Sequence, residues 1–223
     1  MHTSLQKLNL IKSKINEIVN KKQLKTKPNI IVVSKKFSLD KIKLLIENGH
    51  IHYGENQIQE AENKWSNFKN QYNKLQLHMV GKLQSNKAKK AVKLFDYIHS
   101  LDNEKLASKI FEYEKELNKK TKLFIQINLG DESQKSGIIF KDVKNFIEYC
   151  TKDLSLSIIG LMCLPPINAN ASDYFIMLKE AAIKFSLPEL SMGMSSNYET
   201  AIECGATYLR LGTAILGKRS VTG

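Results

Sequence analysis

Two short segments near the C-terminus carry residue types that bind anions. Residues 193–196 (Gly-Met-Ser-Ser) and 212–214 (Gly-Thr-Ala) each precede a stretch that we expect to be helical. The N-terminus of a helix presents unpaired N–H groups and the positive end of its dipole, so it binds phosphate readily. Ser195 and Thr213 add hydroxyl groups. Ordinary helix capping would explain either segment without a ligand, but two of them so close together indicate a phosphate site.

Two cations could complete that site. Lys35 and Lys36 follow an apolar run at residues 29–34, and Arg210 lies in the last apolar run of the chain. Successive side chains of a strand point to opposite faces, so the two lysines should face different sides, and alternation does not say which side is inward. The alternatives are a solvated charge for the lysine and a salt bridge to a neighbouring carboxylate for Arg210.

Together, these groups match the needs of one cofactor. Pyridoxal phosphate requires a phosphate anchor, a lysine for a Schiff base and a partner for its ring nitrogen. An arginine stays charged and donates a hydrogen bond, so it would leave the pyridine nitrogen unprotonated and make the cofactor a weaker electron sink. The residue types therefore predict a pyridoxal phosphate site that includes Arg210 and one of the two lysines, Lys35 or Lys36.

Such a site requires a fold that brings one of these lysines and Arg210 together from opposite ends of the sequence. The hydrophobic pattern predicts a fold of this kind. Short apolar, β-branched runs alternate with segments of helical spacing, which indicates βαβ units and a parallel sheet. The expected strands lie at residues 29–34, 52–54, 75–80, 95–100, 122–128, 157–162, 189–191 and 208–210. Eight repeats favour an α/β fold with a single (β/α)8 TIM barrel over residues 1–223, preceded by an extra N-terminal helix.

The barrel prediction also places the site. In TIM barrels the active site lies at the C-terminal ends of the strands, and phosphate often binds the loops after strands 7 and 8. Those loops are the two segments described first. No GxGxxG follows an expected strand, which argues against a dinucleotide-binding fold.

Composition narrows the class of partner. The net charge of +12 raises nucleic acid as a possibility. The lysines are scattered along amphipathic segments, however, and no aromatic-rich RNA-binding signature accompanies them. No apolar run approaches the ~20 residues that span a bilayer, and the N-terminus lacks the apolar region of a signal peptide. We expect a cytoplasmic protein that contacts neither nucleic acid nor membrane.

The cysteines and histidines do not indicate a metal site. Cys150, Cys163 and Cys204 are odd in number, widely spaced and without CxxC pairing. The five histidines form no HExxH pattern. We expect buried, reduced thiols and no bound metal.

At the level of whole motifs, the chain resembles the pyridoxal phosphate homeostasis protein family, whose fold is similar to the N-terminal barrel domain of alanine racemase. The resemblance runs from Val32-Val-Ser-Lys35 to the C-terminus. It includes Tyr53-Gly-Glu-Asn56, His78-Met-Val-Gly-Lys-Leu-Gln-Ser-Asn-Lys87, Asn128-Leu-Gly-Asp-Glu-Ser-Gln-Lys-Ser-Gly137, Gly160-Leu-Met162, Leu190-Ser-Met-Gly-Met-Ser195 and Arg210-Leu-Gly-Thr-Ala-Ile-Leu-Gly217. Any one motif would be weak, whereas the ordered set is specific.

The resemblance implies roles for individual residues. It implies Lys35 as the residue that binds pyridoxal 5'-phosphate covalently, as the lysine after Val-Ser, and Arg210 beside the ring nitrogen. The residues implied around the phosphate are Ser195, Gly212 and Thr213. Those implied to line the cofactor pocket are Asn56, His78 and Met192. The family usually continues after its lysine with a small or aromatic residue and then a proline. Lys36-Phe37-Ser38 stands there instead, which predicts a less rigid loop with a second amine.

Two functions remain after the resemblance. The first is a protein that holds pyridoxal phosphate for its intracellular homeostasis, without substrate turnover, as a monomer whose partners are apo-enzymes that use the cofactor. The alternative is a pyridoxal-phosphate-dependent amino-acid racemase. Racemisation needs a second acid–base group opposite the lysine. In racemases with this barrel that group is a tyrosine from a second domain, and we expect none here because the chain ends at Gly223. We therefore expect no catalytic residues.

Overall fold

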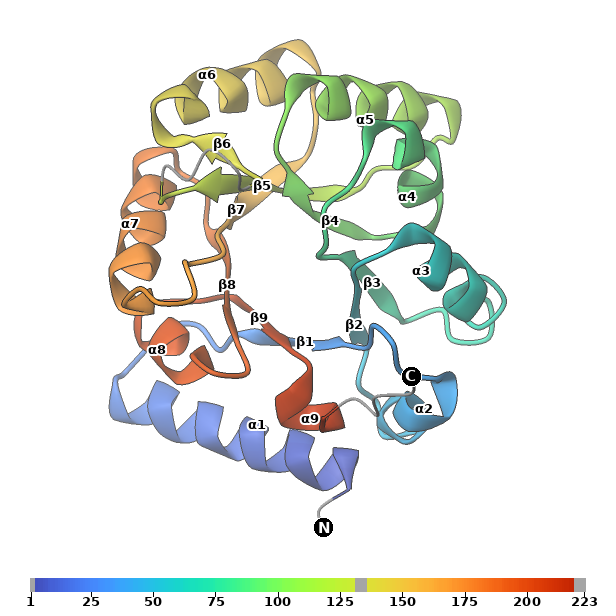
Figure 1. Ribbon diagram of the computed structural model, residues 1–223, viewed down its shortest axis with the longest axis vertical. Helices are drawn as coiled ribbons and strands as arrows, with labels where there is room; N and C mark the ends of the chain where they lie inside the picture. The colour runs from blue at the N-terminus through green and yellow to red at the C-terminus, as the bar shows by residue number, and fades with distance from the viewer. Residues whose placement is uncertain (1–2, 131–135, 219–223) are drawn as a thin grey trace.

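Parallel strands close on themselves into a barrel that helices surround (Figure 1). The computed structural model describes residues 3–130 and 136–218. The barrel strands are β1 (Asn29–Val33), β2 (His52–Glu55), β3 (Gln76–Met79), β4 (Tyr97–Leu101), β5 (Lys122–Asn128), β7 (Ile158–Met162), β8 (Glu189–Met194) and β9 (Tyr208–Leu211). Each pairs in parallel with its neighbours in chain order, and β9 pairs with β1 to close the ring. The predicted (β/α)8 TIM barrel is confirmed.

Short, mostly buried strands explain this architecture. All five residues of β4 and four of the five in β1 are buried, as expected for strands covered on both faces. One short strand was not predicted: β6 (Ile138–Ile139) pairs only with β5 and lies outside the closed ring. Its two residues are too few to give a hydrophobic period that the sequence could reveal.

The helices surround the barrel. They are α1 (Ser4–Lys21), α2 (Leu39–Glu47), α3 (Ile58–Trp65), α4 (Ala88–Leu94), α5 (Glu104–Glu116), α6 (Val143–Glu148), α7 (Ala171–Lys184), α8 (Tyr198–Glu203) and α9 (Thr213–Leu216). Short turns are η1 (Ser85–Lys87), η2 (Phe140–Asp142) and η3 (Tyr149–Asp153). The N-terminal helix α1 is confirmed: Thr3 and Gln6 form a capping box at its start, and it packs against α2, α8 and α9. Among the described helices, none is long and apolar enough to cross a membrane.

The strands separate two buried regions, which we call the outer layer and the barrel interior. The outer layer lies between strands and helices and contains Ile30 and Val32 of β1. The barrel interior contains the alternate residues Ile31 and Val33. Alternation along β1 thus sends its side chains to two different regions, as the pleat requires.

Two glycines permit close approach near the carboxyl ends of the strands. A Cβ on Gly81 would lie 2.3 Å from the carbonyl oxygen of Asn56, so this glycine lets the segment after β3 approach the segment after β2. Gly193 has a φ of +88°, and a Cβ there would lie 2.5 Å from the Cβ of Ala201. Both positions require glycine for their local geometry.

Candidate functional site

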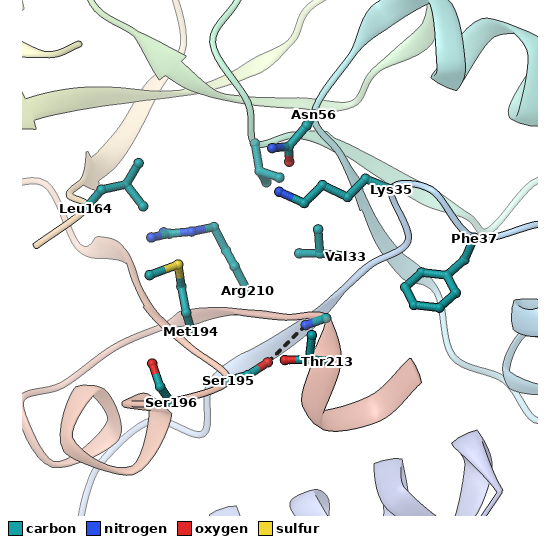
Figure 2. Close-up of a pocket in the computed structure, with 12 residues that line it drawn as sticks. Val33, Lys35, Phe37, Asn56, Leu164, Met194, Ser195, Ser196, Arg210 and Thr213 are labelled. Carbon is teal, nitrogen blue, oxygen red and sulfur yellow. Dashed lines mark hydrogen bonds between the residues drawn. The ribbon is translucent and has the colours of Figure 1, made fainter. Parts of the chain in front are cut away.

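A cavity of about 560 Å³ opens at the carboxyl ends of the barrel strands (Figure 2). Its volume is in the range of pockets that bind small molecules. It is lined by Val33, Lys35, Phe37, Asn56, Val80, Leu164, Met194, Ser195, Ser196, Arg210, Gly212 and Thr213. These residues follow or end β1, β2, β3, β7, β8 and β9, so the cavity occupies the position of active sites in TIM barrels.

Lys35 is the lysine of the pair that faces this cavity. Ile31 and Val33 point into the barrel interior, and Lys35 continues their side of β1 into the cavity. Lys36 is exposed, with its backbone in the left-handed region at a φ of 63°, and does not line the cavity. The structure therefore answers the question that strand alternation left open.

A buried ionic cluster fixes the backbone on both sides of Lys35. Lys64 of α3 donates to the carbonyl oxygen of Ser34 at 2.8 Å, to Glu55 at 2.8 Å and to Glu60 at 3.1 Å. The backbone N–H of Lys36 donates to the carboxylate of Glu60. These contacts hold the loop that lacks the family's usual proline, because they tie the residues before and after Lys35 to α3.

A single hydroxyl group joins the two C-terminal turns. The Oγ of Ser195 accepts from the backbone N–H of Gly212 at 3.3 Å (Figure 2). It also accepts from the backbone N–H of Ala214 at 3.2 Å. Neither bond uses the hydroxyl hydrogen of Ser195, which can still donate. Ser195 therefore contacts the start of α9 rather than capping α8, whose N-cap residue is Asn197. Thr213 is the first residue of α9 and lines the cavity beside Ser195.

Arg210 is a buried cation at the base of the cavity. Its side chain is 5% exposed, and its guanidinium donates to Ser191 Oγ at 2.6 Å and to the carbonyl oxygen of Cys163 at 2.9 Å. Burial lowers the pKa of Arg210 from 12.5 to about 10, so the group stays charged at neutral pH. No ion pair among residues 3–130 and 136–218 includes Arg210, so the salt bridge considered as its alternative role is absent from that part of the chain.

The structure gathers six of the eight predicted site residues. Lys35, Asn56, Ser195, Arg210, Gly212 and Thr213 all line the cavity. Met192 does not: its side chain is fully buried in the outer layer, and Met194 lines the cavity instead. Met192 follows Ser191, whose side chain lies in the barrel interior, so the alternation of the strand turns Met192 outward. Met194 reaches the cavity because of a β-bulge, since Ser191 pairs with Tyr208 and Met194 pairs with Arg210. The extra residue on β8 changes the alternation, and the positive φ of Gly193 accommodates it.

His78 also lies elsewhere than expected. It is fully buried inside the barrel, where it stacks on Tyr97 with ring centroids 4.2 Å apart, and it does not line the cavity. The sequence analysis missed the remaining lining residues, which are Val33, Phe37, Val80, Leu164, Met194 and Ser196. Val33 could have been found, because it shares the side of β1 that carries Lys35.

The lining residues fit a phosphorylated aldehyde with an aromatic ring. Lys35 offers an amine, Arg210 a buried donor, and the joined turns offer the hydroxyl groups of Ser195 and Thr213. Val80, Leu164 and Met194 give the cavity apolar walls. Within the described part of the chain, no group of three His, Cys, Asp or Glu side chains could hold a metal ion. The three cysteines are free and buried, as predicted.

Known proteins share both the sequence and the barrel. The family model for the N-terminal domain of alanine racemase matches residues 7–220. The chain is 35% identical to the pyridoxal phosphate homeostasis protein of Vibrio alginolyticus over 203 residues, which cover 85% of this chain and 86% of the relative. It is 32% identical to the protein of the same name from Haemophilus influenzae over 226 residues, which cover 96% of this chain and 94% of the relative.

Solved structures also match this chain in sequence and in fold. PipY of Synechococcus elongatus, solved with pyridoxal phosphate bound, is 33% identical and superposes with a TM-score of 0.79, covering 91% of this chain and all of PipY. An alanine racemase of Clostridium difficile is 16% identical with a TM-score of 0.66, and the match covers 93% of this chain and 56% of the racemase. At that identity the racemase shows a shared fold alone.

Proposed function

Because this chain belongs to the pyridoxal phosphate homeostasis protein family, we propose that it binds pyridoxal phosphate in the cavity and maintains its supply without turning over a substrate. One observation supports this above the others. Lys35, Arg210 and the joined turns at Ser195 and Gly212 line a single cavity, although the sequence separates them by most of its length.

The turns supply the phosphate contacts in this proposal. The hydroxyls of Ser195 and Thr213 and the backbone at Gly212 line the same side of the cavity. Charge-assisted hydrogen bonds from such donors are about twice as strong as neutral ones. The bond network around Ser195 already fixes the two turns relative to each other, so phosphate binding costs little reordering.

The amine and the guanidinium act on the other end of the cofactor. When bound, the cofactor supplies an aldehyde carbon that can condense with the amine of Lys35 to a Schiff base, releasing water. Arg210 would donate a hydrogen bond toward the ring nitrogen and would not give up its proton, because its pKa remains about 10 despite burial. A ring nitrogen that only accepts a bond withdraws electrons weakly, so the bound cofactor would be a weak electron sink.

The proposal also includes partner proteins, an oligomeric state and a cellular compartment. Apo-enzymes that need pyridoxal phosphate are the proposed recipients, since an open cavity at the barrel mouth lets the cofactor leave. In this proposal the protein acts as a monomer. Three free, buried cysteines are compatible with a reducing compartment, the cytoplasm.

The test is chemical trapping. Purified protein mixed with pyridoxal phosphate should develop a visible absorbance band, and borohydride should fix the cofactor on the peptide that contains Lys35. Lys35→Ala should abolish the band and the trapping, whereas Lys36→Ala should keep both. Cofactor trapped on Lys36, or none trapped in the wild type, would refute the proposal.

A further inference from the structure

The barrel interior contains a continuous chain of hydrogen bonds between ionisable groups. His52 Nδ1 lies 2.9 Å from His78 Nε2, and His78 Nδ1 lies 3.0 Å from His99 Nε2. His99 Nδ1 lies 2.8 Å from Ser191 Oγ, which accepts from Arg210 at 2.6 Å. TIM barrel interiors are dominated by branched aliphatic side chains, so this polar line through the interior requires an explanation.

The three imidazoles in the chain are neutral. Burial is the main cause that holds the pKa values of His78 and His99 well below 6.5, and the positive charge of Arg210 lowers that of His99 further. Burial and the positive charge of Lys122 also lower the pKa of His52. A neutral imidazole has one nitrogen that donates and one that accepts. Each histidine can therefore extend a chain of bonds that all point in the same direction.

Arg210 fixes that direction because a guanidinium only donates. Ser191 Oγ accepts from Arg210, and its single hydroxyl hydrogen then donates to Nδ1 of His99. His99 must carry its proton on Nε2, which donates to Nδ1 of His78. The reverse order would make Ser191 accept twice and leave its hydroxyl hydrogen without an acceptor among the described residues.

We infer that Ser191 and His99 are positioning residues for Arg210, and that His78 and His52 continue a directed chain from the cofactor cavity to the opposite end of the barrel. The inference rests on the proposed function, in which Arg210 faces the cofactor ring. Ser191 holds one guanidinium nitrogen and the carbonyl of Cys163 holds the other, so the plane of the group is fixed. His99 in turn orients the Ser191 hydroxyl and is itself stacked on Phe124 at 4.3 Å.

The packing around the chain supports a positioning role. His78 is stacked on Tyr97, and His52 makes edge contacts with Tyr97 and Tyr208. Rings held on several sides cannot rotate to exchange partners without disturbing the barrel interior. The far end is the first residue of β2, where His52 is only partly buried. Arg210 is thus oriented by a line of groups that crosses the barrel.

The first test needs no cofactor. Nitrogen-15 NMR of the histidine side chains in the apo-protein near pH 7.5 distinguishes the two neutral tautomers from the imidazolium. We expect His52, His78 and His99 to be neutral with their protons on Nε2. A proton on Nδ1 of His99, or an imidazolium at His78 or His99, would overturn the directed chain.

The second test measures the positioning role with pyridoxal and pyridoxal phosphate as ligands. Ser191→Ala should weaken both by the same factor, about tenfold, because the ring end and not the phosphate end is affected. Ser191→Thr keeps a hydroxyl and should restore most of the affinity. Ser100→Ala is the matched control, since Ser100 is equally buried but makes no hydrogen bond in the described structure. Unchanged affinities in Ser191→Ala would refute the positioning role. If the wild type binds neither pyridoxal nor pyridoxal phosphate, the proposed function is refuted. The histidine tautomers measured in the first test would still show whether the directed chain of hydrogen bonds exists.

Discussion

The outer layer and the barrel interior are both buried, yet they are built from different residues. The outer layer consists mainly of apolar and aromatic side chains, with the buried pair of Lys64 and Glu55 between β2 and α3. The barrel interior combines six apolar or aromatic residues with His78, His99, Ser191 and Arg210. Apolar packing is non-directional, so many residues could replace one another in the outer layer. Hydrogen bonds are directional, so the barrel interior depends on particular atoms.

The comparison between the two regions first predicts that a truncation in the outer layer causes a large loss of stability without a specific loss of binding. Phe175 of α7 is fully buried in the outer layer, whereas Phe140 is 43% exposed. Phe175→Ala should lower the free energy of unfolding by about 3–5 kcal/mol, because it leaves a cavity. Phe140→Ala should change it by about 0.5 kcal/mol or less. Urea unfolding measures both values, and equal effects would contradict the difference drawn between buried and exposed positions.

At the cavity we predict the opposite result, a specific loss of binding without a large loss of stability. The double change Ser195→Ala and Thr213→Ala should weaken pyridoxal phosphate binding by about 10²- to 10⁴-fold, since each charge-assisted bond contributes about 1.5–3 kcal/mol. Unphosphorylated pyridoxal should lose much less affinity. The control is Ser66→Ala, at an exposed position after α3. Equal losses for both ligands would mean that the two hydroxyls only stabilise the turns.

A third prediction concerns pH and a histidine at the edge of the barrel. Burial, and then the charge of Lys12, lowers the pKa of His50 from 6.5 to about 4. The unfolded chain therefore binds this proton more readily than the folded chain between about pH 4 and 6.5, so stability falls as the pH drops through that window. His50 alone should cost about 2 kcal/mol at pH 5 relative to pH 8.

Chemical unfolding at the two pH values checks this contribution. In His50→Gln the difference in unfolding free energy between pH 5 and pH 8 should be smaller than in the wild type by about 2 kcal/mol. The comparison uses differences within each protein, so a general loss of stability in the variant does not affect it. An unchanged pH dependence would show that His50 does not titrate in this range.

The last prediction is that the protein does not racemise alanine. The described residues that line the cavity include no tyrosine. Tyr53 belongs to the outer layer, and Tyr208 lies in the barrel interior, where burial raises its pKa. No second acid–base group of that kind therefore faces Lys35 from these positions. Alanine should take up no deuterium at its α-carbon beyond the rate with free cofactor. Faster exchange with inversion, lost in Lys35→Ala, would establish racemase activity.

The outer layer was the more predictable of the two regions. Runs such as residues 29–34, and helical spacing such as that of Ile42, Leu45 and Ile46, follow directly from burial on one or both faces. The barrel, the extra helix α1 and the position of the cavity could be predicted in this way. The two-residue strand β6 could not, because so short a segment carries no period.

Only part of the site could be predicted from the sequence. Lys35 and Arg210 have unusual chemistry at strand ends, and small residues mark the turns, so both features are visible in the sequence. The bulge in β8 is not, and it brings Met194 into the cavity wall, whereas Met192 faces the outer layer. His78 belongs to a motif of the family, but its position inside the barrel depends on the register of β3 against β2 and β4. Register is a tertiary property that a single chain segment does not reveal.

The pairing of β1 with β9 has a consequence for biosynthesis. The ribosome produces Lys35 long before Arg210, and the ladder from Asn29 opposite Tyr208 to Val32 opposite Leu211 can form only when both strands are available. Contacts this distant in sequence form slowly, and domains are synthesised from the N-terminus. The lysine thus emerges long before the guanidinium and the last turn that complete its cavity. A nascent chain without β9 has only part of the cavity, so the full set of lining residues assembles only after β9 and the turn that follows it have been synthesised.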